Sequence, residues 1–228
     1  MPAQLTFYGH ATFGLQVEKY DILIDPYFTG NPSASASAEE VKADYILVSH
    51  GHGDHLGDAV KIAKRTGATV ITVAEIATWL RERGVKTHAQ HLGGGHQHPF
   101  GYCKLTLALH GSALPDGSYG GNPAGFLITL LDGKKIYFAG DTGLFGDMRL
   151  IGDEGVDVAL LPIGDNYTMG PRDALRAVEF LHPGVVIPMH YNTFPLIQQD
   201  AHAWKQQVEE KTASKVVILQ PGESYTLG

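Results

Sequence analysis

The chain has 228 residues, of which 43% are hydrophobic and 18% are charged, and its formal net charge is -7. This composition is typical of a soluble globular protein and predicts a single domain over residues 1–228. The lone cysteine, Cys103, excludes an intrachain disulfide, and the lack of a Lys/Arg cluster disfavours nucleic acid as a partner.

The N-terminal sequence has no basic segment followed by a long apolar run, as a signal peptide would. No apolar stretch approaches the roughly 20 residues that a transmembrane helix needs. We therefore expect a cytoplasmic protein that acts on a small-molecule substrate without membrane insertion. Whether it forms a homo-oligomer stays open.

Short apolar runs alternate along the chain with amphipathic segments, which predicts an α/β fold with helices covering the sheet faces. Strands are expected over residues 20–24, 44–48, 68–73, 104–109, 124–131, 135–139, 156–161, 184–189 and 215–219. Helices are expected over residues 58–65, 74–83, 173–181 and 200–211. Two stretches are expected to be loops: residues 91–101 at the surface, and residues 112–123 as either a lid or a plain connection.

Five of these strands end within two residues of a histidine or an aspartate. The residues at these endings are Asp25, His50, His110, Asp141 and His190. In layered α/β folds ligands gather beyond strand ends, where rigid strands meet adaptable loops. The pattern therefore predicts one site at which these side chains converge.

The densest part of this pattern is the sequence SHGHGDHL, residues 49–56. Gly51 and Gly53 allow a tight backbone path, so that the imidazoles of His50 and His52 can point at one place. Neutral imidazoles and carboxylates suit zinc and comparable first-row metals, including Mn²⁺, Fe²⁺ and Ni²⁺. The candidate ligands exceed the needs of one tetrahedral ion, which favours two divalent ions that share a carboxylate.

At this point the sequence resembles the metallo-β-lactamase superfamily, whose signature is His-x-His-x-Asp-His with further His, Asp and His residues downstream. It looks closest to the small bacterial metal-dependent hydrolases of the UPF0173 type, near ascorbate-phosphate lactonases and N-acyl-phosphatidylethanolamine phospholipases. The resemblance covers essentially the whole chain, through the motifs YGHATF, ILIDPYFTGNP, ADYILVSHGHGDHLGDAV, YFAGDTGLFGDM, LLPIGDNYTMGP and IPMHYNTFP. It implies an αββα sandwich with the metals at one edge of two facing sheets.

The resemblance also implies a role for each candidate residue. The first metal ligands are His50, His52 and His110, the second are Asp54, His55 and His190, and Asp141 bridges the two ions. Asp25 resembles a group that orients the ligands by hydrogen bonds. His10 resembles a residue that contacts substrate or supports the second metal. Ser112, Asn166 and Asn192 are candidate substrate-binding residues.

The expected function is that of a binuclear metal-dependent hydrolase that uses a metal-bridging hydroxide. Asp54 would hold the hydroxide in line, and His10 could stabilise the developing negative charge. The leading substrate class is a lactone or other carboxylic ester of a small metabolite, with or without a phosphate group. The alternatives are a phosphodiesterase acting on a lipid or cyclic nucleotide, which an electropositive pocket would favour, and a non-catalytic metal-dependent sensor or scaffold.

Overall fold

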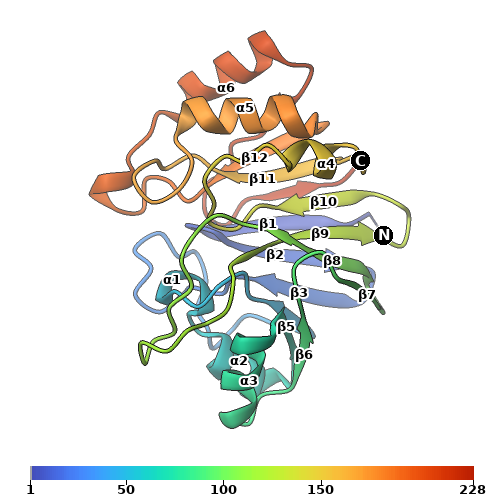
Figure 1. Ribbon diagram of the computed structural model, residues 1–228, viewed down its shortest axis with the longest axis vertical. Coiled ribbons are helices and arrows are strands. Elements are labelled where there is room, and N and C mark those ends of the chain that lie inside the picture. The colour runs from blue at the N-terminus through green and yellow to red at the C-terminus, as the bar shows by residue number, and fades with distance from the viewer. Residues whose placement is uncertain (1) are drawn as a thin grey trace. The chain divides into compact units, whose positions relative to one another are not determined.

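The computed structural model describes residues 2–228, which divide into two compact units. The first unit comprises the residues up to Gly94 together with Gly111–Ala124 and Leu219–Gly228, and the second comprises Gly95–His110 and Gly125–Ile218. Each unit is built on one seven-stranded sheet (Figure 1). The chain crosses between the units after Gly94, His110, Ala124 and Ile218, and the single domain expected from the sequence stays a prediction.

The sheet of the first unit has the strand order β14-β1-β2-β3-β4-β5-β6. Strands β14, β1, β2 and β3 pair antiparallel, whereas β3 to β6 pair parallel. The strand bounds are β1 Gln4–Gly9, β2 Thr12–Val17, β3 Tyr20–Ile24, β4 Tyr45–Leu47, β5 Thr69–Val73, β6 Thr87–Gln90 and β14 Ser224–Thr226.

The helices of the first unit are α1 Gly53–Leu56, α2 Ala59–Thr66 and α3 Ala74–Glu82. Helix α2 ends at Gly67, whose left-handed φ of +78° costs a glycine little. Helix α3 follows β5 without a loop and buries Ile76 and Leu80. Figure 1 shows α2 and α3 beside β5 and β6, where α2 packs against β5 and α3 packs against both strands.

The sheet of the second unit has the strand order β13-β12-β11-β10-β9-β8-β7. Strands β10 to β13 pair parallel, while β9 pairs antiparallel with β10 and β7 pairs antiparallel with β8. The strand bounds are β7 Gly95–His98, β8 Gly101–Leu107, β9 Ala124–Leu130, β10 Lys135–Phe138, β11 Val158–Pro162, β12 Val185–Met189 and β13 Lys215–Val216. The surface loop expected over residues 91–101 is therefore wrong in part, because residues 95–98 are the strand β7.

The helices of the second unit are α4 Met148–Gly152, α5 Pro171–Leu181 and α6 Ala201–Lys211, with the 3₁₀ turn η1 Pro195–Ile197. Figure 1 shows α5 and α6 lying on one side of β11 and β12. Trp204 of α6 is buried in the core of this unit, and its indole N–H donates to the carbonyl of Pro171, at 2.9 Å. No helix within residues 2–228 has the length and apolar character needed to cross a membrane.

Candidate metal centre

Three of the predicted site residues adopt the left-handed backbone conformation directly after a strand. The φ angles are +61° at His10 after β1, +46° at Asp25 after β3 and +53° at His190 after β12. Residues with a side chain rarely adopt this conformation, because it crowds Cβ against the backbone. Such strain clusters at functional sites, where the surrounding structure holds a side chain in a required direction.

The His-x-His-x-Asp-His motif forms a bend followed by the single turn α1. The backbone amides of His55 and Leu56 both donate to the carbonyl of His52, at 3.0 and 2.9 Å. Nε2 of His50 lies 3.1 Å from Nδ1 of His52. The first unit thus places four ligand candidates of the motif within six residues of chain.

His10 joins this group from the end of β1. Its Nε2 lies 3.2 Å from Oδ2 of Asp54, and Nε2 of His55 lies 3.9 Å from the same oxygen. His10 is 1% exposed and packs edge-on against the ring of Tyr27. Burial and, second, the negative charge of Asp54 raise the pKa of Tyr27, which keeps this neighbouring phenol neutral.

Asp25 is the hydrogen-bonding hub of the first unit's site. Its Oδ1 accepts from the amide of Ser49 at 2.7 Å, and its Oδ2 accepts from the hydroxyl of Ser49 at 2.5 Å and lies 2.7 Å from Nδ1 of His55. Because a carboxylate only accepts, Nδ1 of His55 must carry the proton, which leaves the Nε2 lone pair for a metal.

Ser49 fixes the tautomer of His50 in the same way. Its single hydroxyl proton is donated to Asp25, so the contact of 2.9 Å between its Oγ and Nδ1 of His50 requires the imidazole to donate. His50 is therefore also held in the tautomer whose Nε2 carries a lone pair. Ligand atoms of Asp25, His50 and His55 lie within 4.8 Å of one another, but the bonds to Ser49 and His55 engage both oxygens of Asp25.

The second unit holds the remaining predicted ligands around Asp141. Oδ2 of Asp141 lies 3.1 Å from Nε2 of His190 and 3.5 Å from Nε2 of His110. Asp141 is 3% exposed, directly beyond β10. Thr142 ties two of these segments together, because its hydroxyl accepts from the amide of Leu109 at 2.9 Å.

The spacing of the donor atoms fits divalent metal coordination. Ligand bonds of about 2.0–2.1 Å at tetrahedral angles place neighbouring donor atoms about 3.3 Å apart. The separations of 3.1 Å between the nitrogens of His50 and His52, and of 3.1 and 3.5 Å around Asp141, lie near this value. Within each unit, therefore, the donor set has the chemistry and the spacing of a metal ligand set.

The three candidate substrate-binding residues differ in how firmly they are held. The hydroxyl of Ser112 accepts from the amide of Gly51 at 3.1 Å and donates to the carbonyl of Gly120 at 3.2 Å, so it is engaged within its own unit. Asn192 is exposed at a shallow hollow of about 460 Å³, with its Oδ1 accepting from the amide of Gln199 at 2.7 Å. Asn166 is exposed in the loop between β11 and α5.

Sequence reasoning did not identify Ser49 or Thr142 as parts of the site, although each adjoins a predicted ligand. Their position beside His50 and Asp141 was the available signal. Asp58 is the N-cap residue of α2, as the helix expected over residues 58–65 indicates, but its side chain does not cap the helix. Instead its carboxylate accepts from the amides of Phe28 and Thr29 and from the hydroxyl of Thr29. These bonds hold the segment that follows Asp25.

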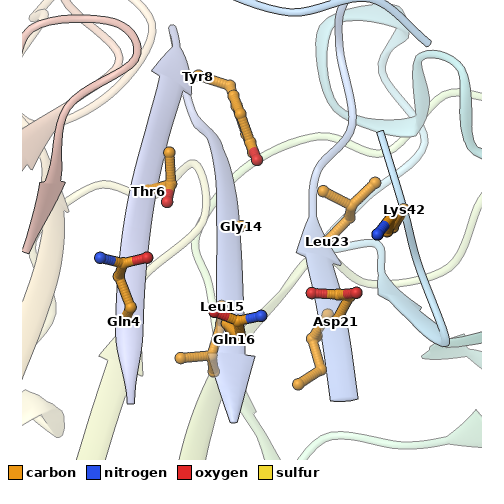
Figure 2. Close-up of a pocket in the computed structure, with 10 residues that line it drawn as sticks. Gln4, Thr6, Tyr8, Gly14, Leu15, Gln16, Asp21, Leu23 and Lys42 are labelled. Atoms are coloured by element: carbon orange, nitrogen blue, oxygen red, sulfur yellow. The ribbon is translucent and has the colours of Figure 1, made fainter. Parts of the chain in front are cut away.

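A separate hollow of about 190 Å³ lies on the sheet of the first unit, over β1, β2 and β3. Figure 2 shows polar side chains of the three strands in a row, Gln4, Gln16 and Asp21, with Tyr8 near Gly14. The ring of Tyr8 fills the space that a side chain at Gly14 would need. None of the predicted site residues lines this hollow, so the candidate site is defined by its donor atoms rather than by cavity size.

Comparison with known proteins also indicates a metal-binding protein. The family model described as β-lactamase superfamily domain matches residues 20–191. A UPF0173 metal-dependent hydrolase of Desulforamulus reducens is 56% identical over 225 residues, covering 96% of this chain and 98% of that protein. One from Pelotomaculum thermopropionicum is 55% identical over 229 residues, covering 98% of this chain and all of that protein.

Solved structures of other proteins share the fold of this chain. Igni18, a metallo hydrolase from the archaeon Ignicoccus hospitalis, superposes with a TM-score of 0.91 at 40% identity, over 100% of this chain and 99% of its own. An isothiocyanate hydrolase from Delia radicum gut bacteria shares the fold at 21% identity, with a TM-score of 0.76 over 98% of both chains.

The fold class and the family resemblance expected from the sequence are thereby confirmed. The chain belongs to the metallo-β-lactamase superfamily, within its group of UPF0173 metal-dependent hydrolases.

Proposed function

We propose that this hydrolase acts on a lactone or other carboxylic ester of a small, uncharged metabolite, with two divalent metal ions, most simply Zn²⁺. The ions are assigned to the donor sets of both units, as the family resemblance implies. His50, His52 and His110 would hold the first ion, Asp54, His55 and His190 would hold the second, and Asp141 would serve both. A cytoplasmic location and a small-molecule partner belong to the same proposal.

The uncharged substrate class rests on one observation about charge. The segments that carry the candidate site residues contain no lysine or arginine, although the chain has 17 such residues. These segments are 9–12, 25–33, 49–58, 109–124, 140–148, 163–170 and 189–200. Phosphate groups are generally bound by Arg or Lys, whose cationic hydrogen bonds are stronger than neutral ones. The scarcity of such groups favours an uncharged ester over a phosphodiester.

Bound divalent ions supply an activated water at neutral pH and polarise the oxygen under attack. The protein's own groups position the reaction. Asp25 and Ser49 fix the tautomers of His55 and His50, so that the ligand nitrogens need no proton transfer before binding. Nε2 of His10 lies 3.2 Å from Oδ2 of Asp54, so its single N–H can orient that carboxylate or, with substrate bound, donate instead to negative charge that develops on the substrate.

The test is hydrolysis of a matched panel by the metal-loaded protein. The panel contains a neutral sugar lactone, its phosphorylated counterpart, a thioester, a phosphodiester and a phosphomonoester. An isothiocyanate is added because one neighbour in fold is named for that substrate. We expect turnover of the neutral lactone, loss of it on chelation, and loss of it in His190→Ala.

His182→Ala is the matched control, since His182 also has a left-handed φ, of +46°, at the end of α5, but it is not a candidate ligand. It should retain wild-type activity. Preference for the phosphorylated lactone would contradict the uncharged class and point to Arg172, the first basic residue after the 163–170 segment. Preference for the phosphodiester would establish the alternative chemistry.

A further inference from the structure

The segment after His110 is an ordered hairpin. Ala113 and Tyr119 form an antiparallel bridge. Inside it, the amide of Leu114 donates to the carbonyl of Ser118 at 2.9 Å, and the amide of Gly117 donates to the carbonyl of Leu114 at 2.8 Å. We refer to residues 113–119 as the 113–119 hairpin. Its tip is the turn around Asp116.

The tip of the hairpin is bound to helix α3 of the same unit. Oδ2 of Asp116 accepts from the indole N–H of Trp79 at 2.6 Å and lies 3.4 Å from the guanidinium of Arg83. That guanidinium stacks on the Trp79 ring, 3.4 Å from its centroid. Oδ1 accepts from the hydroxyl and the amide of Ser118, at 2.5 and 3.0 Å. These contacts use both oxygens of the carboxylate.

These hydrogen bonds stabilise the ionised form of Asp116. Hydrogen bonds from Ser118 first, and from Trp79 second, lower the pKa of Asp116 to about 2. A carboxylate whose pKa is lowered on folding contributes its stabilisation above its unfolded pKa, near 4, and loses it as the pH falls toward 2. At neutral pH the Asp116 carboxylate is therefore ionised and can accept the hydrogen bonds from Trp79 and Ser118.

The base of the hairpin lies against the metal-binding motif. The Ser112 hydroxyl accepts from the amide of Gly51, and the amide of Gly120 donates to the Ser112 carbonyl at 2.7 Å. A methyl group at Gly51 would lie 2.9 Å from the carbonyl oxygen of Ala113, so the hairpin backbone directly covers this glycine. A methyl group at Gly111 would contact the His52 ring at 3.5 Å.

We propose that Asp116 is a positioning residue for the metal ligands His50 and His52, acting through the 113–119 hairpin. Binding of the tip to α3 fixes the base, and the base fixes the backbone of Gly51 between the two ligands. Residues 112–123 are then a fixed wall of the site and do not open as a lid. The metal-affinity part of this inference rests on the proposed function, whereas the coupling between Asp116 and Gly51 does not.

The experiment compares wild type with Asp116→Ala in three measurements. Acrylamide quenching of fluorescence reports on Trp79, because Trp204, the other tryptophan, is 1% exposed and shielded. Hydrogen exchange of the Gly51 amide in metal-free protein reports on the backbone of the motif. Competition with a chelator gives the Zn²⁺ dissociation constant. The control is Glu154→Ala, which removes a surface ion pair with Lys104 in the second unit.

In Asp116→Ala we expect stronger quenching of Trp79, at least tenfold faster exchange of the Gly51 amide, and roughly tenfold weaker Zn²⁺ binding. The Glu154→Ala protein should match wild type in all three. Unchanged exchange at Gly51 would overturn the inference, with or without a change in quenching. If wild type bound no Zn²⁺, the proposed function would fail, and exchange at Gly51 would still decide the role of Asp116.

Discussion

A single proton on each imidazole decides whether the side chain can bind a metal, and this protein assigns that proton with two residues. Asp25 and Ser49 receive the Nδ1 protons of His55 and His50, which leaves a lone pair on each Nε2 atom for a metal. Neither partner needs to touch a metal. The left-handed φ of Asp25 indicates that the backbone bears strain to keep the carboxylate in place.

Asp25→Asn tests this arrangement. The amide keeps one acceptor oxygen but turns an N–H₂ group toward groups that now donate to the carboxylate, so His55 and Ser49 cannot both keep their bonds. We expect metal affinity to fall by about 10- to 100-fold, measured by chelator competition. The control is Asp44→Asn, since Asp44 accepts from the Asp21 amide at 2.9 Å in an exposed setting. Equal affinity in both variants would show that the tautomers are set in another way.

A second test, at His10, separates the role of its backbone conformation from the role of its imidazole. His10→Asn keeps a residue type that tolerates positive φ and removes the contact with Asp54. We expect kcat to fall by roughly 10²–10³ with metal content unchanged. His182→Asn, at another left-handed histidine, should have wild-type kcat. Loss of metal in His10→Asn would instead identify His10 as a ligand-supporting group.

The sequence predicts the buried strands and helices best. Apolar residues dominate the β3, β5 and β12 runs, and the amphipathic patterns of α3 and α6 predicted the bounds of these helices within a residue. Strands β1 and β2 were not predicted, because one face of each is incompletely buried and polar residues interrupt the apolar run. The 113–119 hairpin was not predictable either, because its anchor joins Asp116 to Trp79, 37 residues earlier.

The edge strand β13 shows how a helix can complete a sheet. This strand has two residues, and side chains of α6 take the place of a further strand beside it. The Val216 amide donates to Glu209 at 3.0 Å, and Lys205 donates to the Val216 carbonyl at 2.8 Å. Both backbone groups are thereby withheld from pairing with another chain.

Glu209→Ala should therefore destabilise the protein by about 1 kcal/mol, since the backbone amide of the buried Val216 loses its acceptor. Urea denaturation would give the free energy of unfolding. Glu210→Ala, at the next exposed position of α6, should leave it unchanged. If the two variants are equally stable, water replaces the Glu209 carboxylate without cost.

For the molecule as a whole, the sequence supplied the ligand types and the order in which they occur, and the structure adds their grouping within each unit. The first unit gathers His10, His50, His52, Asp54 and His55. The second unit gathers His110, Asp141 and His190. Neither set has the seven ligands that the family resemblance assigns to a pair of ions. The proposed function therefore requires the two sets to act on the same ions.

A double-mutant cycle across the units tests that requirement. His52→Ala and His110→Ala each remove one proposed ligand of the first ion, from different units. Metal at 100 times its dissociation constant stabilises a protein by about 2.7 kcal/mol at each site. If the two residues hold one ion, either substitution abolishes that stabilisation, and the double variant loses no more than a single one. If they hold separate ions, the losses add to roughly twice that value.

The measurement is the free energy of unfolding in urea for all four proteins, with Zn²⁺ and again with chelator. The chelated series is the control, because the effects of the two substitutions on the metal-free fold cancel in the difference. Non-additive losses of stabilisation by Zn²⁺ would establish that the units share an ion. Additive losses would contradict the shared centre while leaving each donor set as a metal site of its own, and the hydrolytic chemistry would then have to be sought within one unit.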